Sequence, residues 1–405
     1  MTAAAENRGF APDVSTVRAF LEDAHLELAG RAAEFARREL AAEPDPPDDA
    51  GARRRARELL GALGAGGWLA PIAAGDFRSC CLLRETLAAA SPLSDAVFAL
   101  QALAGVPIRL AGSDALVRAW LEPAVAGRAM GAFAMTEPGA GSDVAAIATR
   151  AVRDGDAYVL DGRKTLISNA GLADFYVVFA STDPEAGRRG LSAFVVPADA
   201  PGLRFVGPQV MSAPHPLGEI AFEGCRVPGD HRLGEEGAGL RIGMATLDRL
   251  RPTVGAAACG MAARALREAL GHVVRREQFG RRLADFQLVQ EKLGRMATEL
   301  AAARLLVYRA AWERDRGAER TNVESAMAKA FATEAAQRVV DEAVQLLGGR
   351  GVLADSVVDR LYRSVRALRI YEGTTEIQRL TVGAQLIETA ADPRPANDAS
   401  DAPAS

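Results

Sequence analysis

A short acidic segment near the C-terminus has the composition of a buried base. Residues 370–376 read IYEGTTE, so Glu372 lies beside a glycine and two hydroxyls, with apolar and aromatic residues before it. Burial disfavours the charged carboxylate and raises its pKa above about 4.3, towards the range useful for taking a proton at neutral pH. Gly373 lets the backbone approach a flat ligand closely. The same residues also describe a helix stop followed by a new N-cap, so the segment alone leaves both interpretations open.

A second stretch could hold a polar heterocycle. Residues 133–143 read FAMTEPGAGSD. Gly139 and Gly141 free the backbone, and Thr136, Ser142 and nearby N–H groups can then hydrogen-bond a heterocycle or a pyrophosphate. The stretch is not a Rossmann fingerprint, because it lacks the third glycine and the strand-to-helix setting. A glycine-rich loop with a helix cap is the alternative.

Composition excludes several classes of protein. The 405 residues are 49% hydrophobic and 25% charged, enough for a large core in two or three domains. The net charge is −4 without long charged blocks, which argues against nucleic acid as a partner. Neither the four cysteines nor the four histidines have metal-site spacing, so we predict no metal. Reduced cysteines and a polar N-terminus predict a cytoplasmic protein without a secretory signal.

The elements that must position these residues follow from periodicity. Residues 15–128 are rich in Ala, Leu and Arg and favour helices, and the apolar window 87–108, interrupted by Asp95 and two prolines, predicts a buried helix and not a membrane span. Residues 131–233 contain β-branched runs separated by turn signals, with a hairpin expected at Asp161-Gly162. Beyond Gly239 the helical period returns.

Two long helices are expected in the last third of the chain. Apolar residues spaced three and four apart between Phe286 and Ala310 predict one of them, and a second should run from Asn322 to Leu347. The predicted organisation is an N-terminal helical domain (1–130), a middle β domain (131–235), a C-terminal helical bundle (236–390) and a disordered tail (391–405).

Taken together, the motifs resemble those of the acyl-CoA dehydrogenase family. Besides the two segments above, the similarity rests on residues 247–252 (LDRLRP), 276–280 (REQFG), Phe286-Gln287 and 345–349 (QLLGG), in family order, and it extends from about Trp68 to Ile387. It implies an α+β, mainly α fold with an N-terminal helical domain, a middle β-barrel domain and a C-terminal four-helix bundle. It also implies assembly as a homotetramer or homodimer and FAD between the last two domains, partly contacted by a neighbouring subunit through Arg276, Gln278 and Phe279.

The resemblance implies a role for each matched residue. In the family, a base removes the α-proton of an acyl-CoA thioester while the flavin accepts the β-hydrogen as hydride, giving a trans-2-enoyl-CoA, and the electrons pass to an electron-transfer flavoprotein. Glu372 matches the base. The positions expected to bind FAD are Phe133, Met135, Thr136, Ser142, Leu166, Ile167, Ser168, Arg276, Gln278, Phe279, Phe286, Gln287, Gln345, Leu346, Gly348, Gly349, Thr374 and Glu376. Those expected to bind the acyl-CoA are Ser142, Asp248, Arg251, Tyr371 and Gly373.

Some of these positions have simpler interpretations. Arg276 could be a solvated helix charge, Phe286 could belong to the core, and Asp248 with Arg251 could form a surface ion pair. Leu166 and Ser168 stand where the family commonly has tryptophan and threonine. The alternative functions are an acyl-CoA oxidase or flavin monooxygenase of the same fold that uses dioxygen, or a non-catalytic acyl-CoA-binding protein.

Overall fold

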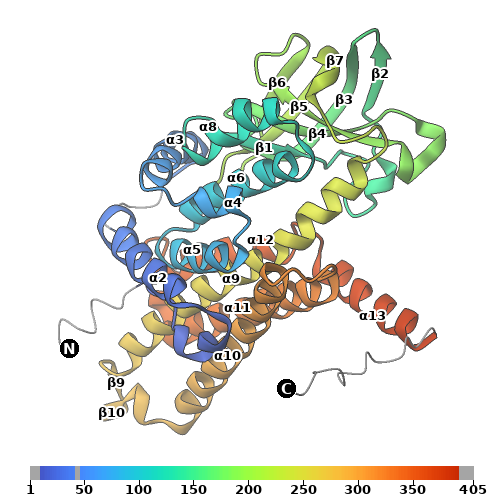
Figure 1. Ribbon diagram of the computed structural model, residues 1–405. Helices are drawn as coiled ribbons and strands as arrows, with labels where there is room; N and C mark the ends of the chain where they lie inside the picture. The colour runs from blue at the N-terminus through green and yellow to red at the C-terminus, as the bar shows by residue number, and fades with distance from the viewer. Residues whose placement is uncertain (1–9, 42–45, 392–405) are drawn as a thin grey trace.

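The computed structural model describes residues 10–41 and 46–391. A sheet lies at one end of the molecule, long helices lie at the other, and the N-terminal helices pack along both (Figure 1). Helical, β and helical elements follow one another along the chain, with the changes between Met130 and Gly131 and between Leu233 and Gly239. The predicted fold class, mainly helical with a central β domain, is confirmed.

The N-terminal helices begin at polar caps. Asp48, Asp76 and Ser91 each accept a hydrogen bond from a backbone N–H of the first turn of the helix that follows. The helices are α2 (Asp23–Phe35), α3 (Asp49–Ala65), α4 (Ala70–Ala74), α5 (Phe77–Ala90), α6 (Pro92–Ala111), α7 (Asp114–Leu116) and α8 (Glu122–Val125), with shorter turns η1 (Val14–Phe20), η2 (Ala36–Leu40) and η3 (Val117–Leu121).

Helix α6 is the predicted buried helix of residues 87–108. It is long and apolar enough to cross a membrane, but most of it is buried inside the protein. Its Gln101 donates to the carbonyls of Ala124 and Ala129, and its Asp95 pairs with Arg84 of α5. These contacts make α6 a core helix.

The middle domain is one sheet with an open strand order. Its order is β6-β7-β3-β2-β4-β5-β8, and β1 pairs with β4 in parallel. Along β4, Phe175, Val177 and Phe179 pack towards the helices, while Tyr176 and Val178 pack among the strands. The strands are β1 (Gly131–Ala134), β2 (Arg150–Asp154), β3 (Ala157–Ser168), β4 (Phe175–Ser181), β5 (Leu191–Pro197), β6 (Leu203–Pro208), β7 (Leu217–Pro228) and β8 (Arg232–Leu233).

The predicted hairpin at Asp161-Gly162 is wrong. Strand β3 runs straight through this pair, and only a register irregularity against β7 marks it. The Asp161 carboxylate accepts the Gly224 N–H at 2.7 Å, so it serves the neighbouring strand. Gly162 is required by a close approach, since a Cβ there would lie 2.5 Å from the Thr149 hydroxyl. The tight turn lies earlier, at Gly155, which has φ 63°.

The C-terminal part is a bundle of long helices. The predicted helices are confirmed as α10 (Gln287–Asp315) and α11 (Asn322–Leu347), which pack with α9 (Gly239–Val273). The strands β9 (Glu277–Gln278) and β10 (Arg281–Arg282) form a hairpin between α9 and α10, and α12 (Val357–Leu368) and α13 (Thr375–Ala391) follow. The tail predicted to be disordered lies outside the described residues except for Ala391.

Buried polar groups tie the N-terminal helices to the bundle. On α5, Glu85 accepts hydrogen bonds from Arg304 at 2.7 Å and from the Tyr308 hydroxyl at 2.9 Å, both on α10. All four cysteines of the chain are buried. Three of them, Cys80, Cys81 and Cys259, lie on α5 and α9, the helices that flank this network. Burial raises the pKa of every thiol, that of Cys225 to about 11.

Candidate active site

Glu372 lies in the turn between α12 and α13, in a left-handed backbone conformation with φ 55°. A non-glycine residue in such a conformation is strained by about 1–3 kcal/mol and keeps it only where its surroundings impose it. Here they do. The Glu372 carbonyl accepts hydrogen bonds from Arg251 Nε at 3.1 Å and Gln378 Nε2 at 3.2 Å, and the Gly373 carbonyl accepts one from Lys329 Nζ at 2.6 Å.

The residues after Glu372 start the next helix. Thr374 Oγ1 accepts the N–H of Ile377, and Thr375 Oγ1 donates to Glu334 Oε1 of α11 at 2.8 Å. Arg369 also binds Glu334, so both ends of the turn are fastened to α11. The helix-cap interpretation is therefore correct for Thr374, while Thr375 fastens the start of the helix to α11. It does not account for Glu372, whose side chain caps nothing.

The Glu372 carboxyl group has the electrostatics of a base. Its Oε2 atom is buried and has no hydrogen-bond partner within residues 10–41 and 46–391. Burial raises the pKa of this carboxyl, against the opposing charges of Arg84, Lys329 and Arg251. The Lys329 pKa is lowered to about 8, chiefly by burial. An unpartnered carboxylate oxygen with raised proton affinity can take a proton from a bound carbon acid.

A second cluster forms where β1 and β3 end. The Thr165 N–H donates to the Thr136 carbonyl at 3.0 Å, which places residues 133–136 beside residues 165–168. Leu166 and Asn169 both have positive φ, and Leu166 is 56% exposed while Ile167 is buried. The half-buried ring of Phe133 and the hydroxyls of Thr136 and Ser168 therefore lie in one place. We call residues 133–136 and 165–168 the sheet-edge cluster.

His215 contacts this cluster but carries no sequence signal. Its Nε2 lies 2.7 Å from Ser168 Oγ. Burial lowers the His215 pKa to about 4, so the ring is neutral at neutral pH. In the tautomer that carries hydrogen on Nε2, the ring donates to the Ser168 oxygen and leaves the Ser168 hydrogen free for a ligand. Only the fold brings together these two residues, which come from different strands and loops.

The glycine-rich loop is held by a buried ion pair that the sequence did not reveal. Glu137 accepts the N–H groups of Ala148 and Thr149 and pairs with Lys164 at 2.7 Å. The Lys164 side chain is fully buried, and burial lowers its pKa to about 8. Alternation along β3 gave no clear signal for the burial of Lys164, because the register against β7 is irregular both before and after this residue. The glutamate of the motif is therefore structural.

Helix α9 connects the two clusters. A Cβ at Gly243 would lie 2.6 Å from Met135 Cε, so the sheet edge packs against the first turns of this helix. Arg251, two turns later on α9, holds the Glu372 carbonyl. Eight residues of α-helix span about 12 Å. A ligand that reaches from the β1 and β3 ends to Glu372 would therefore lie along α9.

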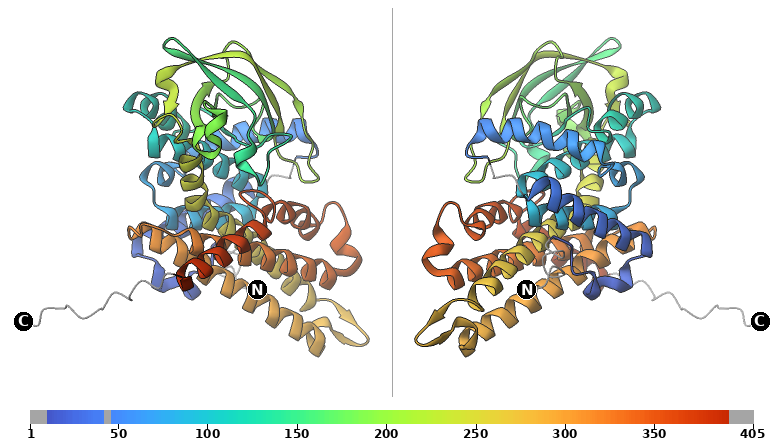
Figure 2. Two further views of the ribbon diagram at one scale, coloured as in Figure 1. Left: turned by 90° about the vertical axis from the view of Figure 1, so that its right-hand side faces the viewer. Right: turned by 90° about the vertical axis from the view of Figure 1, so that its left-hand side faces the viewer.

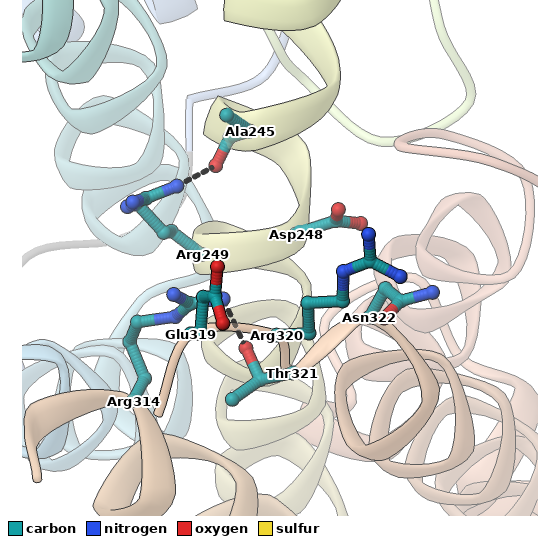
Figure 3. A pocket seen from close by; sticks show the side chains of 8 residues that line it. All are labelled: Ala245, Asp248, Arg249, Arg314, Glu319, Arg320, Thr321 and Asn322. Carbon is teal, nitrogen blue, oxygen red and sulfur yellow. Dashed lines mark hydrogen bonds between the residues drawn. The ribbon is translucent and has the colours of Figure 1, made fainter. Parts of the chain in front are cut away.

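Asp248 and Arg251 form a largely buried ion pair and not the surface pair that the sequence allowed, since Arg251 is only 7% exposed and Asp248 is half-buried. Next to them lies a pocket of about 260 Å³ rich in guanidinium groups (Figure 3). Its cations are Arg249, Arg314 and Arg320, accompanied by the acids Asp248 and Glu319. Burial and the neighbouring arginines lower the Arg249 pKa, and burial lowers that of Arg314 against the opposing effect of nearby acids.

Several predicted cofactor residues lie elsewhere in the same chain. The β9–β10 hairpin with Arg276, Gln278 and Phe279 lies at the end of the bundle far from the sheet (Figures 1 and 2). Phe279 is 93% exposed, and Phe286 is half-buried beneath Arg281, whose guanidinium lies 3.8 Å from the ring centre. The other predicted cofactor residues of the C-terminal part are Gln287, Gln345, Gly348, Gly349 and Glu376, which are exposed, Leu346, which is buried, and Thr374, which is half-buried.

Ser142 is exposed in the glycine-rich loop, while Tyr371 and Gly373 adjoin Glu372. The single chain thus assembles the predicted base, its neighbours and the sheet-edge residues, and it does not bring the hairpin to them. Among the residues that the structure describes, no group of three or more His, Cys, Asp or Glu side chains is placed to hold a metal ion.

Comparison with known proteins identifies the class. Family models for the N-terminal, middle and C-terminal domains of acyl-CoA dehydrogenases match residues 22–128, 132–225 and 237–387. The chain therefore belongs to the acyl-CoA dehydrogenase family and is a flavoprotein oxidoreductase.

Individual relatives support this assignment. The chain is 38% identical over 380 residues to a probable acyl-CoA dehydrogenase, fadE25, of Mycobacterium leprae, covering 91% of this chain and 96% of that protein. It is 38% identical over 322 residues to the caffeyl-CoA reductase-Etf complex subunit CarC of Acetobacterium woodii, covering 78% and 83%. A solved glutaryl-CoA dehydrogenase from Mycobacterium smegmatis in complex with FADH2 superposes with a TM-score of 0.83 at 27% identity, covering 96% and 99%.

Proposed function

We propose that the protein catalyses the FAD-dependent α,β-dehydrogenation of an acyl-CoA thioester to the trans-2-enoyl-CoA, with Glu372 as the base. The observation that carries the proposal is the buried, unpartnered Glu372 Oε2 on a turn fixed by Arg251, Gln378 and Lys329. An α-proton of a thioester is a weak acid, so its removal needs a base of raised pKa in a site that excludes water.

A donor to the thioester oxygen is also required. Within residues 10–41 and 46–391, the backbone N–H of Glu372 makes no hydrogen bond. It is therefore free to donate to an oxygen on which negative charge develops as the proton leaves. The strained backbone of Glu372 thus presents a base and a donor from a single residue.

The sheet-edge cluster fits a flavin. Thr136 and Ser168 offer hydroxyls, Phe133 and Leu166 offer apolar surface, and nothing lies within 4 Å of the positions that side chains would take at Gly139 and Gly141. Bound there, FAD supplies the acceptor for the β-hydrogen as hydride. Thr136 and Ser168 would hold and orient the ring by hydrogen bonds.

The arginine pocket fits the anionic half of coenzyme A. Arg249, Arg314 and Arg320 present guanidinium groups beside the largely buried pair Asp248–Arg251, and guanidinium groups bind phosphate oxygens through paired donors. Arg251, already bound to Asp248 and to the Glu372 carbonyl, would act by holding the turn and not by binding phosphate.

Assembly, acceptor and compartment complete the proposal. We place the exposed β9–β10 hairpin against the FAD of a neighbouring subunit in a homodimer or homotetramer, because in its own chain the hairpin lies at the end of the bundle far from the sheet (Figures 1 and 2). An electron-transfer flavoprotein is the proposed acceptor, given the relative named for its complex with Etf. The cytoplasm is the proposed compartment.

The test is anaerobic flavin bleaching. Purified yellow protein should lose its flavin absorbance when a saturated acyl-CoA is added, and a panel of straight, branched, cyclic and aromatic thioesters would identify the acyl group. The Glu372→Gln variant should retain FAD and bind the thioester but lose bleaching by several orders of magnitude. Bleaching at the wild-type rate in this variant would refute Glu372 as the base.

An oxidase or monooxygenase of the same fold is the second candidate, favoured by one observation. Leu166 stands at the sheet-edge site with 56% of its surface exposed, where a larger ring would give better shielding from dioxygen. Oxygen consumption during turnover without an added acceptor would support this candidate. Turnover that needs an electron-transfer flavoprotein would exclude it.

A further inference from the structure

A buried ion pair between α5 and α6 lies close enough to the Glu372 turn for its charges to act on the Glu372 carboxyl. Arg84 of α5 and Asp95 of α6 are 1% and 2% exposed and form a two-pronged contact, with Nε–Oδ1 at 2.7 Å and Nη2–Oδ2 at 2.9 Å. A third prong joins Arg84 Nη1 to the Thr253 hydroxyl of α9 at 2.9 Å. The Thr253 hydrogen is donated to the Leu250 carbonyl, so its oxygen must accept from Arg84. The guanidinium is therefore locked in one orientation by three helices.

The pair reaches the catalytic turn through Tyr371. Tyr371 exposes 40% of its surface, but its hydroxyl extends inwards to Arg84. Burial raises the pKa of this hydroxyl, and the charge and hydrogen bond of Arg84 oppose that rise. Among the positive charges that lower the pKa of the Glu372 carboxyl, Arg84 has the largest effect. Burying an ion pair costs desolvation free energy, and replacing such a pair by apolar residues is often neutral or stabilising. We therefore expect the Arg84–Asp95 pair to have a role beyond stability.

We propose that Arg84, clamped by Asp95 and Thr253, is a positioning residue that holds Tyr371 and Glu372 in place and sets the charge balance around the base. The proposal concerns the base that the proposed function uses. It adds a residue that lies outside the family motifs and that comes from a helix far from the Glu372 segment in the sequence.

The charged groups around Glu372 come from four helices and the turn itself. They are Arg84 on α5, Asp95 on α6, Arg251 with its partner Asp248 on α9, Lys329 on α11 and the Tyr371 hydroxyl. Lys329 and Arg251 bind backbone carbonyls of the turn, so their removal would also release the turn. The Arg84–Asp95 pair offers a cleaner change, because it acts on the side chains and leaves those carbonyl contacts intact.

Opposite substitutions should have opposite effects. Arg84→Met removes a positive charge and should raise the proton affinity of Glu372 on the order of tenfold. Asp95→Asn leaves the guanidinium charged without its carboxylate and should lower that affinity. The double variant, Arg84→Met with Asp95→Asn, should return towards the wild type and avoids an unpaired buried charge, which guards against a variant that fails to fold.

The measurement is a pH titration of the Glu372 carboxyl by infrared difference spectroscopy on the FAD-loaded protein, with the Glu372→Gln version of each variant subtracted. Arg304→Met, in the equally buried pair with Glu85, is the matched control and should leave the titration unchanged. Shifts of opposite sign for the two single variants support the proposal. No shift, or shifts of the same sign, overturns it.

The infrared titration needs no acyl-CoA and is therefore independent of the proposed reaction. If no thioester bleaches the flavin while the titration moves as expected, the proposed function fails and the positioning role stands. If thioesters bleach the flavin and the titration does not move, the reverse holds. Where both succeed, the pH profile of anaerobic flavin reduction should move in the same direction as the titration.

Discussion

At the scale of single residues, buried cations surround the turn that carries Glu372. Lys329 is fully buried, and its ammonium group donates to the Gly373 carbonyl. Its pKa of about 8 in the folded chain lies below its ordinary value of 10.5. Between these values the folded protein binds fewer protons than the unfolded chain, so the free energy of unfolding must rise with pH from about 8 to 10.5.

Lys329→Met should remove this dependence. The wild type should gain stability between pH 8 and 10.5, by at most about 3 kcal/mol from this residue. The variant should have a flatter profile in urea unfolding measured across that window. Lys292→Met, at a lysine with 30% of its side chain exposed, is the control and should keep the wild-type slope. An unchanged slope in the Lys329 variant would contradict this account.

The sequence predicted the contiguous parts of the site and not the parts assembled by packing. Glu372, Thr136 and Ser168 were found because each stands in a motif of neighbouring residues. Arg84, Lys329 and His215 were not found, because each meets its partner only after helices and strands distant in the chain have packed. The buried state of Arg251 was also beyond the sequence, since an Asp and an Arg three residues apart look the same on a surface and in a core.

At the scale of elements, α9 and α5 approach more closely than ordinary helices. A Cβ at Gly260 of α9 would lie only 2.0 Å from the Glu85 carbonyl oxygen of α5. Helical periodicity located these helices, but it could not predict which glycine permits this contact. The contact matters for the site because α5 carries Arg84 and α9 carries Thr253.

A glycine pair tests this packing. Gly260→Ala should destabilise the protein by about 1–3 kcal/mol, because the methyl group meets backbone that cannot yield without moving a helix. Gly294→Ala on α10 meets nothing within 4 Å and should stabilise by up to about 1 kcal/mol through helix propensity. Chemical unfolding of both variants measures the change in the free energy of unfolding. Equal changes would show that α5 and α9 can move apart without loss of stability.

At the scale of the whole molecule, apolar side chains remain exposed on several elements of the C-terminal bundle. Phe279, Leu288, Leu380 and Ile387 are 93%, 78%, 66% and 73% exposed. They lie on the hairpin, on α10 and on α13, away from the buried network that joins α5 to α10. Such a distribution is what association between copies would cover.

The proposed assembly predicts a mass that is a multiple of 42.6 kDa in light scattering. Phe279→Asp should weaken FAD retention several-fold while leaving the circular dichroism of the chain unchanged, because Phe279 is 93% exposed in its own chain and the proposed assembly places it against the FAD of a neighbouring subunit. The control is Val152→Asp, at a 61% exposed position on β2, which should leave FAD retention unchanged. A monomer that holds FAD at full occupancy would contradict the prediction.

The burial of all four cysteines has a practical consequence for spectroscopy. Thiols with raised pKa and no exposed surface react slowly with alkylating reagents, so the native chain should take up little maleimide label while folded. A cysteine placed at an exposed position would then be the main reactive thiol. Distances between such labels on two copies could be measured by fluorescence transfer without first removing any native cysteine.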